Sequence, residues 1–125
     1  MDKQQLDELS NKVIGIAIEV HKHLGPGFVE KIYQTALAYE FDKLNIRHNK
    51  EKEIQVKYKE LYIGSQRIDF LIGDLIILEL KCVSEINDIH LAQTISYLKA
   101  VDVKLGLILN FAKPRLEIKR VVNNI

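Results

Sequence analysis

The sequence predicts an α/β protein in which helices flank a mixed central β-sheet. Two N-terminal stretches repeat apolar residues at helical spacing, several segments of strand-like pattern follow, and one further helical segment precedes two last strands. Such an order of elements builds a layered domain around one sheet. At 125 residues the chain suits a single domain, residues 1–125.

The first predicted helix runs from Leu6 to Leu24, and Gly25-Pro26-Gly27 ends it. A second helix with the same three- and four-residue apolar spacing runs from Phe28 to about Asn45. His21 and His23 stand two residues apart, and helical side chains at that spacing diverge. We therefore expect both histidines on the surface rather than in a metal site.

The pattern then changes to alternation, which predicts a half-buried strand over residues 53–58. Two β segments should follow at residues 61–63 and 66–72, with a break or a bulge at Gly64-Ser65. Residues 75–81 are so apolar that they predict a central strand buried on both faces. Ser84 is placed to cap a helix ending near Ala100, and strands over residues 103–110 and 116–122 complete the sheet.

The composition limits the classes of function and location. The net charge is +1, so an anion-binding surface must come from local clusters of basic residues. The larger cluster, residues 43–59, is interleaved with glutamates and is typical of a solvated face. A single cysteine, Cys82, which we expect to be a small buried thiol, and an N-terminal segment without signal-peptide features favour the cytoplasm. The longest apolar run is too short to span a membrane.

Charged residues in two apolar strands carry the chemical argument. Glu79 and Lys81 lie two residues apart at the end of the central strand, so their side chains share one face. Asp69 stands in the preceding strand between apolar neighbours. A three-residue connection over residues 72–74, or a bulge, would place Asp69 opposite Ile77 and diagonal to Glu79. We predict such an odd-length connection.

Two carboxylates on one face can hold a hard divalent cation, Mg²⁺ or Mn²⁺, and leave room for water and a substrate phosphate. Lys81 could then orient the attacking water and stabilise charge on phosphoryl oxygens. In the competing interpretation, Glu79 and Lys81 form an ion pair at a strand end and Asp69 faces solvent.

The spacing of Asp69, nine further residues and then Glu79-Leu80-Lys81 resembles the PD-(D/E)xK nuclease superfamily, with Ile68 where the superfamily name has proline. Residues 27–33, Gly-Phe-Val-Glu-Lys-Ile-Tyr, resemble the signature of the GxxExxY family within it. The resemblance implies a restriction-endonuclease-like core and a nucleic-acid substrate, in the first place DNA. The residues themselves do not distinguish DNA from RNA.

The resemblance also implies roles for individual residues. Asp69, Glu79 and the backbone carbonyl of Leu80 would bind the metal, Glu30 would reach it directly or through water, and Lys81 would be the catalytic lysine. Without the resemblance, Glu30 is an exposed acid favoured by the helix dipole.

Four further residues would support the site by resemblance. Gln93 and Tyr97 stand four apart on one helix face with His90 close by, and would position substrate or support Lys81. Their alternative is a solvated helix face. Tyr33 is expected in the core, with its hydroxyl tied to the site at most.

The leading hypothesis is therefore a metal-dependent nuclease that uses an activated water. The competing hypothesis is a non-catalytic module on the same fold that binds nucleic acid or a protein. A homodimer, or a larger assembly, would enlarge the small surface that the chain offers to a substrate.

Overall fold

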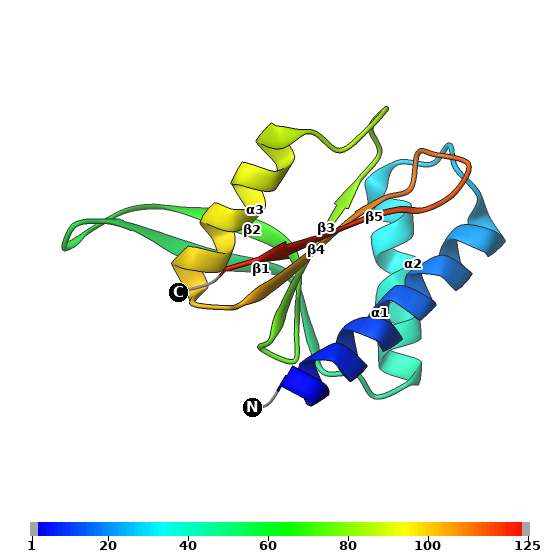
Figure 1. Cartoon of the computed structure of the whole chain (residues 1–125), viewed down its shortest axis with the longest axis horizontal. Helices are drawn as coiled ribbons and strands as arrows, with labels where there is room; N and C mark the ends of the chain where they lie inside the picture. The colour runs from blue at the N-terminus through cyan, green and yellow to red at the C-terminus, as the bar shows by residue number, and fades with distance from the viewer. Residues whose placement is uncertain (1–2, 124–125) are drawn as a thin grey trace.

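The computed structural model describes residues 3–123 and has a five-stranded sheet with helices on both faces (Figure 1). Neighbouring strands pair in the order β1-β2-β3-β4-β5; β3 and β4 are parallel and the other pairs are antiparallel. This arrangement confirms the predicted α/β class with a mixed sheet. The elements are α1 (Lys3–Leu24), α2 (Glu30–Lys43), β1 (His48–Tyr58), β2 (Leu61–Ile72), β3 (Ile76–Lys81), α3 (Asp88–Val101), β4 (Leu105–Asn110) and β5 (Glu117–Val122).

Residues 1–2 and 124–125 of the predicted domain lie outside the described range. The first two of these belong to the N-terminal segment in which the sequence shows no signal-peptide features. In the described part, no helix combines the length and hydrophobicity needed to cross a membrane.

The two faces of the sheet carry separate apolar cores. Helices α1 and α2 cover one face and α3 covers the other, as Figure 1 shows. Strands β3 and β4 lie between these layers, which confirms that the most apolar segment is a central strand buried on both faces. The larger core includes Val13, Ile16, Tyr33, Leu37, Phe41, Phe70, Leu78, Leu107 and Phe111, and the smaller one Ile54, Ile68, Ile77, Leu98, Ile108 and Val121.

The expectation for His21 was wrong. His23 is exposed, but only 6% of His21 is exposed. Its Nε2 lies 2.9 Å from the carbonyl oxygen of Lys113, and its ring packs against Phe111. His21 thus fixes the loop between β4 and β5 against α1, a contact between parts of the chain that no local pattern connects.

The long hairpin of β1 and β2 has an irregularity near Gly64-Ser65, and of the two predicted forms, a break or a bulge, it is a bulge. Gly64-Ser65 does not divide β2, because Gly64 pairs directly with Val56 of β1. The irregularity is a bulge in β2 itself: Val56 pairs with Gly64 and Lys57 with Tyr62, so Ile63, next to Gly64, is the extra residue.

The connection between β2 and β3 has the predicted odd length but not the predicted position. Ile72 pairs with Ile76 and Phe70 with Leu78, so the connection consists of residues 73–75. Gly73 and Asp74 both adopt positive φ, the left-handed conformation that this turn requires. The register brings Asp69 level with Glu79, rather than with Ile77 as we expected.

Helix α3 begins later than predicted, and Ser84 is not its cap. The N-cap is Asn87, whose side chain accepts hydrogen bonds from the backbone N–H groups of Ile89 and His90. The preceding loop is held by buried Asn110, which bonds to both the N–H and the carbonyl of Val83. This long-range contact sets the path of the chain from β3 to α3.

Candidate active site

The centre of the site is a pair of reciprocal hydrogen bonds between Asp69 and the end of β3. The β2–β3 ladder stops at the pair of Phe70 and Leu78. Beyond it, the N–H of Asp69 donates to Oε2 of Glu79 at 2.9 Å, and the N–H of Leu80 donates to Oδ2 of Asp69 at 2.8 Å. Each carboxylate therefore accepts a backbone hydrogen bond from the opposite strand, which fixes the two acids beside each other.

Burial makes this pair electrostatically costly. Only 5% of Glu79 is exposed. Burial raises its pKa to about 8; the charge of Asp69 adds to the rise, while the Asp69 N–H and Lys81 oppose it. Burial also raises the pKa of Asp69, although the hydrogen bond from Leu80 opposes that rise. The two carboxylates cannot both ionise cheaply without additional positive charge.

Lys81 supplies part of that charge. Its position two residues after Glu79 places it near both acids, and its charge lowers the pKa of each. Its Nζ donates a hydrogen bond of 3.3 Å to Oε1 of Gln93 on α3. The structure thus brings together Asp69, Glu79, Lys81 and Gln93 as the sequence predicted.

The other α3 residues lie differently. Tyr97 is buried rather than on a solvated face, and its hydroxyl lies 3.1 Å from Oε1 of Gln66. Burial raises the pKa of Tyr97, and the charges of Glu79 and Asp69 add to the rise, so the hydroxyl lies within their field. His90 uses its Nδ1 to accept a hydrogen bond from the N–H of Asn87, so this nitrogen belongs to the helix cap.

Helix α2 contributes the acid at its first turn. Glu30 begins α2 and lines a cavity of about 230 Å³ together with Lys31, Gln34, Asp69 and Leu80. Since the Leu80 N–H points toward β2, the carbonyl of the same strand residue points that way too. Glu30, Asp69 and the Leu80 carbonyl therefore face a common space.

Tyr33 supports this helix start from the core. Its side chain is fully buried and stacks on Phe111. The hydroxyl donates to the carbonyl oxygen of Gly25 at 2.6 Å and accepts from the N–H of Phe28 at 3.2 Å. Tyr33 is thus a core residue, as expected, and it fixes the loop that leads into Glu30.

Two residues of this region were missed in the sequence. Buried Gln34 donates from Nε2 to the carbonyl oxygen of Asp69 at 3.3 Å; its position four residues after Glu30 was an available signal. Glu51 on β1 adopts positive φ, and its charge contributes to the raised pKa of Asp69. Its carboxylate pairs with Lys31 at 3.4 Å. Nothing in a strand pattern predicts that backbone conformation.

Cys82, expected to be buried, is only half-buried next to this region. Its Sγ lies 3.5 Å from the carbonyl oxygen of Phe28. Burial, with a contribution from the charge of Glu30, raises the pKa of the thiol. The thiol form therefore predominates more than in an ordinary cysteine.

The donor set fits a hard divalent cation. Within residues 3–123, no three His, Cys, Asp or Glu side chains form a ready metal-binding cluster. Asp69 and Glu79 offer carboxylate oxygens and Leu80 a carbonyl oxygen, and Mg²⁺ commonly takes one or two protein carboxylates with water and phosphate oxygens. The raised pKa of both acids indicates negative charge that such an ion would compensate.

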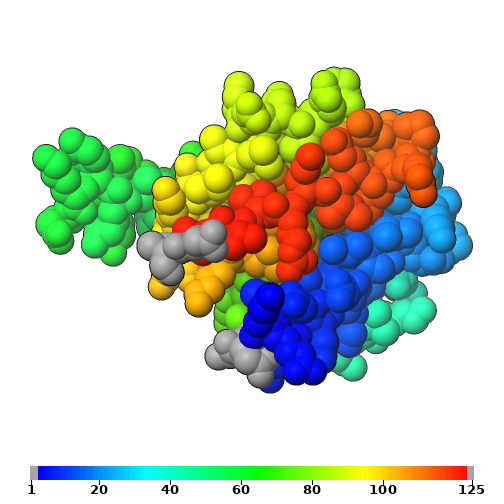
Figure 2. All heavy atoms as spheres, in the orientation of Figure 1, coloured from blue at the N-terminus to red at the C-terminus, as the bar shows by residue number. Residues whose placement is uncertain are grey.

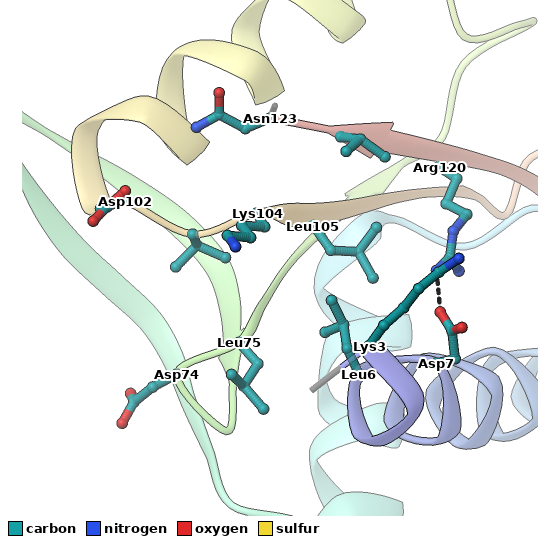
Figure 3. A pocket seen from close by; sticks show the side chains of 12 residues that line it. Lys3, Leu6, Asp7, Asp74, Leu75, Asp102, Lys104, Leu105, Arg120 and Asn123 are labelled. Atoms are coloured by element: carbon teal, nitrogen blue, oxygen red, sulfur yellow. Dashed lines mark hydrogen bonds and ion pairs between the residues drawn. The ribbon is translucent and has the colours of Figure 1, made fainter. Parts of the chain in front are cut away.

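A larger cavity than the one beside Glu30 lies elsewhere on the molecule. It measures about 480 Å³ and is lined by residues near the start of β3 and β4, including Leu75 and Leu105 (Figure 3). Arg120 and Asp7 at its edge form an ion pair of 3.1 Å. The acid pair lies toward the other, carboxyl end of β3, where α/β proteins usually place ligands.

Comparison with known proteins identifies the superfamily of the chain and supports its fold. The sequence model of the PD-(D/E)XK nuclease superfamily matches residues 7–121. A solved structure titled "Crystal structure of SSO0001" is similar, with a TM-score of 0.59 and 16% sequence identity, over 76% of this chain and 50% of that chain. At this identity the similarity concerns the fold alone, and this chain spans half the length of that one. No curated protein matches. Because the family match covers nearly all of the chain, the protein belongs to the PD-(D/E)XK nuclease superfamily.

Proposed function

We propose that this protein is a metal-dependent nuclease of the GxxExxY family that hydrolyses phosphodiester bonds in nucleic acid, in the first place DNA. The observation that carries the proposal is the pair of buried Glu79 and half-buried Asp69 with Lys81 beside it. A buried acid with a raised pKa beside a second acid and a lysine is typical of catalytic sites. The single cysteine supports a reducing, cytoplasmic setting.

Asp69, Glu79 and the Leu80 carbonyl would hold Mg²⁺ or Mn²⁺, with Glu30 across the shared cavity. Such an ion acts as a Lewis acid, lowers the pKa of a water and neutralises phosphoryl oxygens. The reciprocal backbone bonds would keep both acids in position before substrate arrives, so that little reorganisation is needed.

Lys81 would contact the phosphoryl oxygens and orient the attacking water. Its ammonium has three donors, and the bond to Gln93 occupies one of them. The remaining donors can serve a substrate oxygen and a water. Gln93 would therefore be a positioning residue for Lys81. Tyr97 would be another positioning residue, because its hydroxyl lies within the field of Asp69 and Glu79.

One observation favours a second candidate, a binding module without catalysis. Both carboxylates already accept backbone hydrogen bonds where the strands separate, so they have a structural task in the sheet. A chain that used the fold only to bind nucleic acid or a protein could keep them for that task.

The deciding experiment measures cleavage of single- and double-stranded DNA and RNA with Mg²⁺, Mn²⁺ or chelator. Glu79→Ala and Lys81→Ala are compared with Lys119→Ala, which removes an exposed lysine on β5. We expect cation-dependent cleavage that both site variants lose and Lys119→Ala retains. Equal cleavage by all four proteins, or none by the wild type while calorimetry detects Mn²⁺ binding, would argue for the binding module.

A further inference from the structure

The outer part of the β1–β2 hairpin projects from the molecule as an arm, which we define as residues 56–65. Figure 2 shows it in green, standing clear of the remaining atoms. Strand β3 pairs with β2 only from Phe70 to Ile72. Within the part of the chain that the structure describes, no strand covers that side of β2 before Phe70.

The arm exposes an unusual amount of apolar surface. Tyr58, Leu61, Tyr62 and Ile63 are each 57–65% exposed. Tyr58 pairs with Leu61 and Lys57 with Tyr62, while Ile63 is the unpaired residue of a bulge. An isolated two-stranded hairpin is at best marginally stable in water. A partner that covered the arm would remove this apolar surface from water.

The two edges of the hairpin differ in charge. Strand β1 carries lysines and glutamates along its length, and charged side chains protect a sheet edge from pairing. The β2 edge has none over residues 61–66, Leu-Tyr-Ile-Gly-Ser-Gln. Two such edges can pair antiparallel across a two-fold axis without like-charge repulsion.

We propose that the partner is a second copy of this chain, and that two arms pair edge to edge through residues 61–66. This inference is independent of the proposed hydrolysis. Even complete burial of the four exposed side chains would cover only roughly 400–500 Å² per copy, which is at the small end of specific interfaces and predicts a weak dimer. Since β2 also carries Asp69, pairing would hold the two acid sites in a fixed relation.

The chemistry of the arm favours a protein partner over nucleic acid. Phosphate contacts come mainly from lysine and arginine. The two lysines at the tip, Lys57 and Lys59, lie over the rings of Tyr62 and Tyr58 at 5.1 and 5.4 Å. Glu60 follows Lys59 and would repel a phosphate, and the side chains of Leu61 and Ile63 have no hydrogen-bond donor for one.

Sedimentation equilibrium over a wide concentration range tests the dimer. We compare the full chain with Tyr62→Glu and Ile63→Lys on the arm. The matched control is Tyr39→Glu on α2, since Tyr39 and Tyr62 are equally exposed at 64%. We expect a reversible dimer whose dissociation constant rises at least about tenfold in both arm variants and stays unchanged in the control.

Amide hydrogen exchange locates the contact. In the wild type, exchange at residues 61–66 should slow as concentration rises, and in the arm variants it should not. A wild type that stays monomeric at every concentration, or a dimer that both arm variants leave intact, overturns the proposal. A monomer whose arm variants weaken binding to nucleic acid would also overturn it, because the arm would then be a nucleic-acid element.

Discussion

Replacing Glu79 by glutamine should stabilise the metal-free protein at neutral and alkaline pH. The pKa of Glu79 is raised from 4.5 to about 8 by burial. Folding at a pH between these values therefore takes up a proton. The stability that protonated Glu79 contributes is fully present below pH 4.5 and is lost as the pH rises through 8.

The pKa difference sets the size of the effect. At about 1.36 kcal/mol per pKa unit, the rise corresponds to at most about 5 kcal/mol of unfolding free energy lost above pH 8. Glutamine keeps an oxygen that can accept the bond from the Asp69 N–H and does not ionise. The free energy of unfolding of Glu79→Gln should therefore come to exceed that of the wild type by a few kcal/mol as the pH rises from 4.5 to 8.

Urea unfolding in the presence of chelator, from below pH 4.5 to above pH 8, measures this difference. Glu53→Gln on the exposed face of β1 is the matched control and should follow the wild type. Added Mg²⁺ should stabilise the wild type increasingly at higher pH, because the cation binds ionised carboxylates, and should stabilise Glu79→Gln much less. Parallel pH profiles for wild type and Glu79→Gln would refute the reasoning.

Three further substitutions test the surroundings of the site. Gln93→Ala should lower the cleavage rate about tenfold while urea unfolding changes little, because it frees Lys81 from an exposed partner; single-turnover kinetics measures this. Gly106→Ala should destabilise the fold by about 1–3 kcal/mol, since the new Cβ would lie 2.8 Å from a methyl group of Thr94; thermal unfolding measures it. Tyr33→Phe should cost about 1 kcal/mol by removing the bond to the carbonyl between α1 and α2, and faster amide exchange in that loop would reveal its loosening.

The sequence was most informative where local periodicity decides structure. The apolar stripe of α1 and the buried strand β3 follow from patterns of neighbouring residues, and the odd-length connection before β3 follows from the requirement that Asp69 and Glu79 share a face. The same alternation placed Glu79 and Lys81 on one face, whereas the contact of Gln93 with Lys81 was expected only from the resemblance to the nuclease superfamily.

It was least informative where distant segments decide. Both Ser84 and Asn87 could cap a helix. In the structure Asn87 is the cap, and the loop before it is fixed by the hydrogen bond from the Val83 N–H to the side chain of Asn110, 27 residues away. The burial of His21 likewise depends on a loop 92 residues away. The shift of the β2–β3 turn by one residue follows from left-handed backbone at Gly73 and Asp74, which hydrophobic patterning does not encode.

The exchange of backbone bonds between Asp69 and the end of β3 has an evolutionary consequence. Asparagine and glutamine present the same acceptor oxygen without charge, so a descendant that no longer needs the acids can lose them and keep its sheet. The side chain of Lys81 donates to Gln93 on α3 and not to the sheet, so the pairing of the strands does not depend on that side chain. In relatives of this fold that have lost catalytic activity, Lys81 should be the first of these three positions to be substituted. The two acid positions should keep a hydrogen-bond acceptor, as asparagine or glutamine.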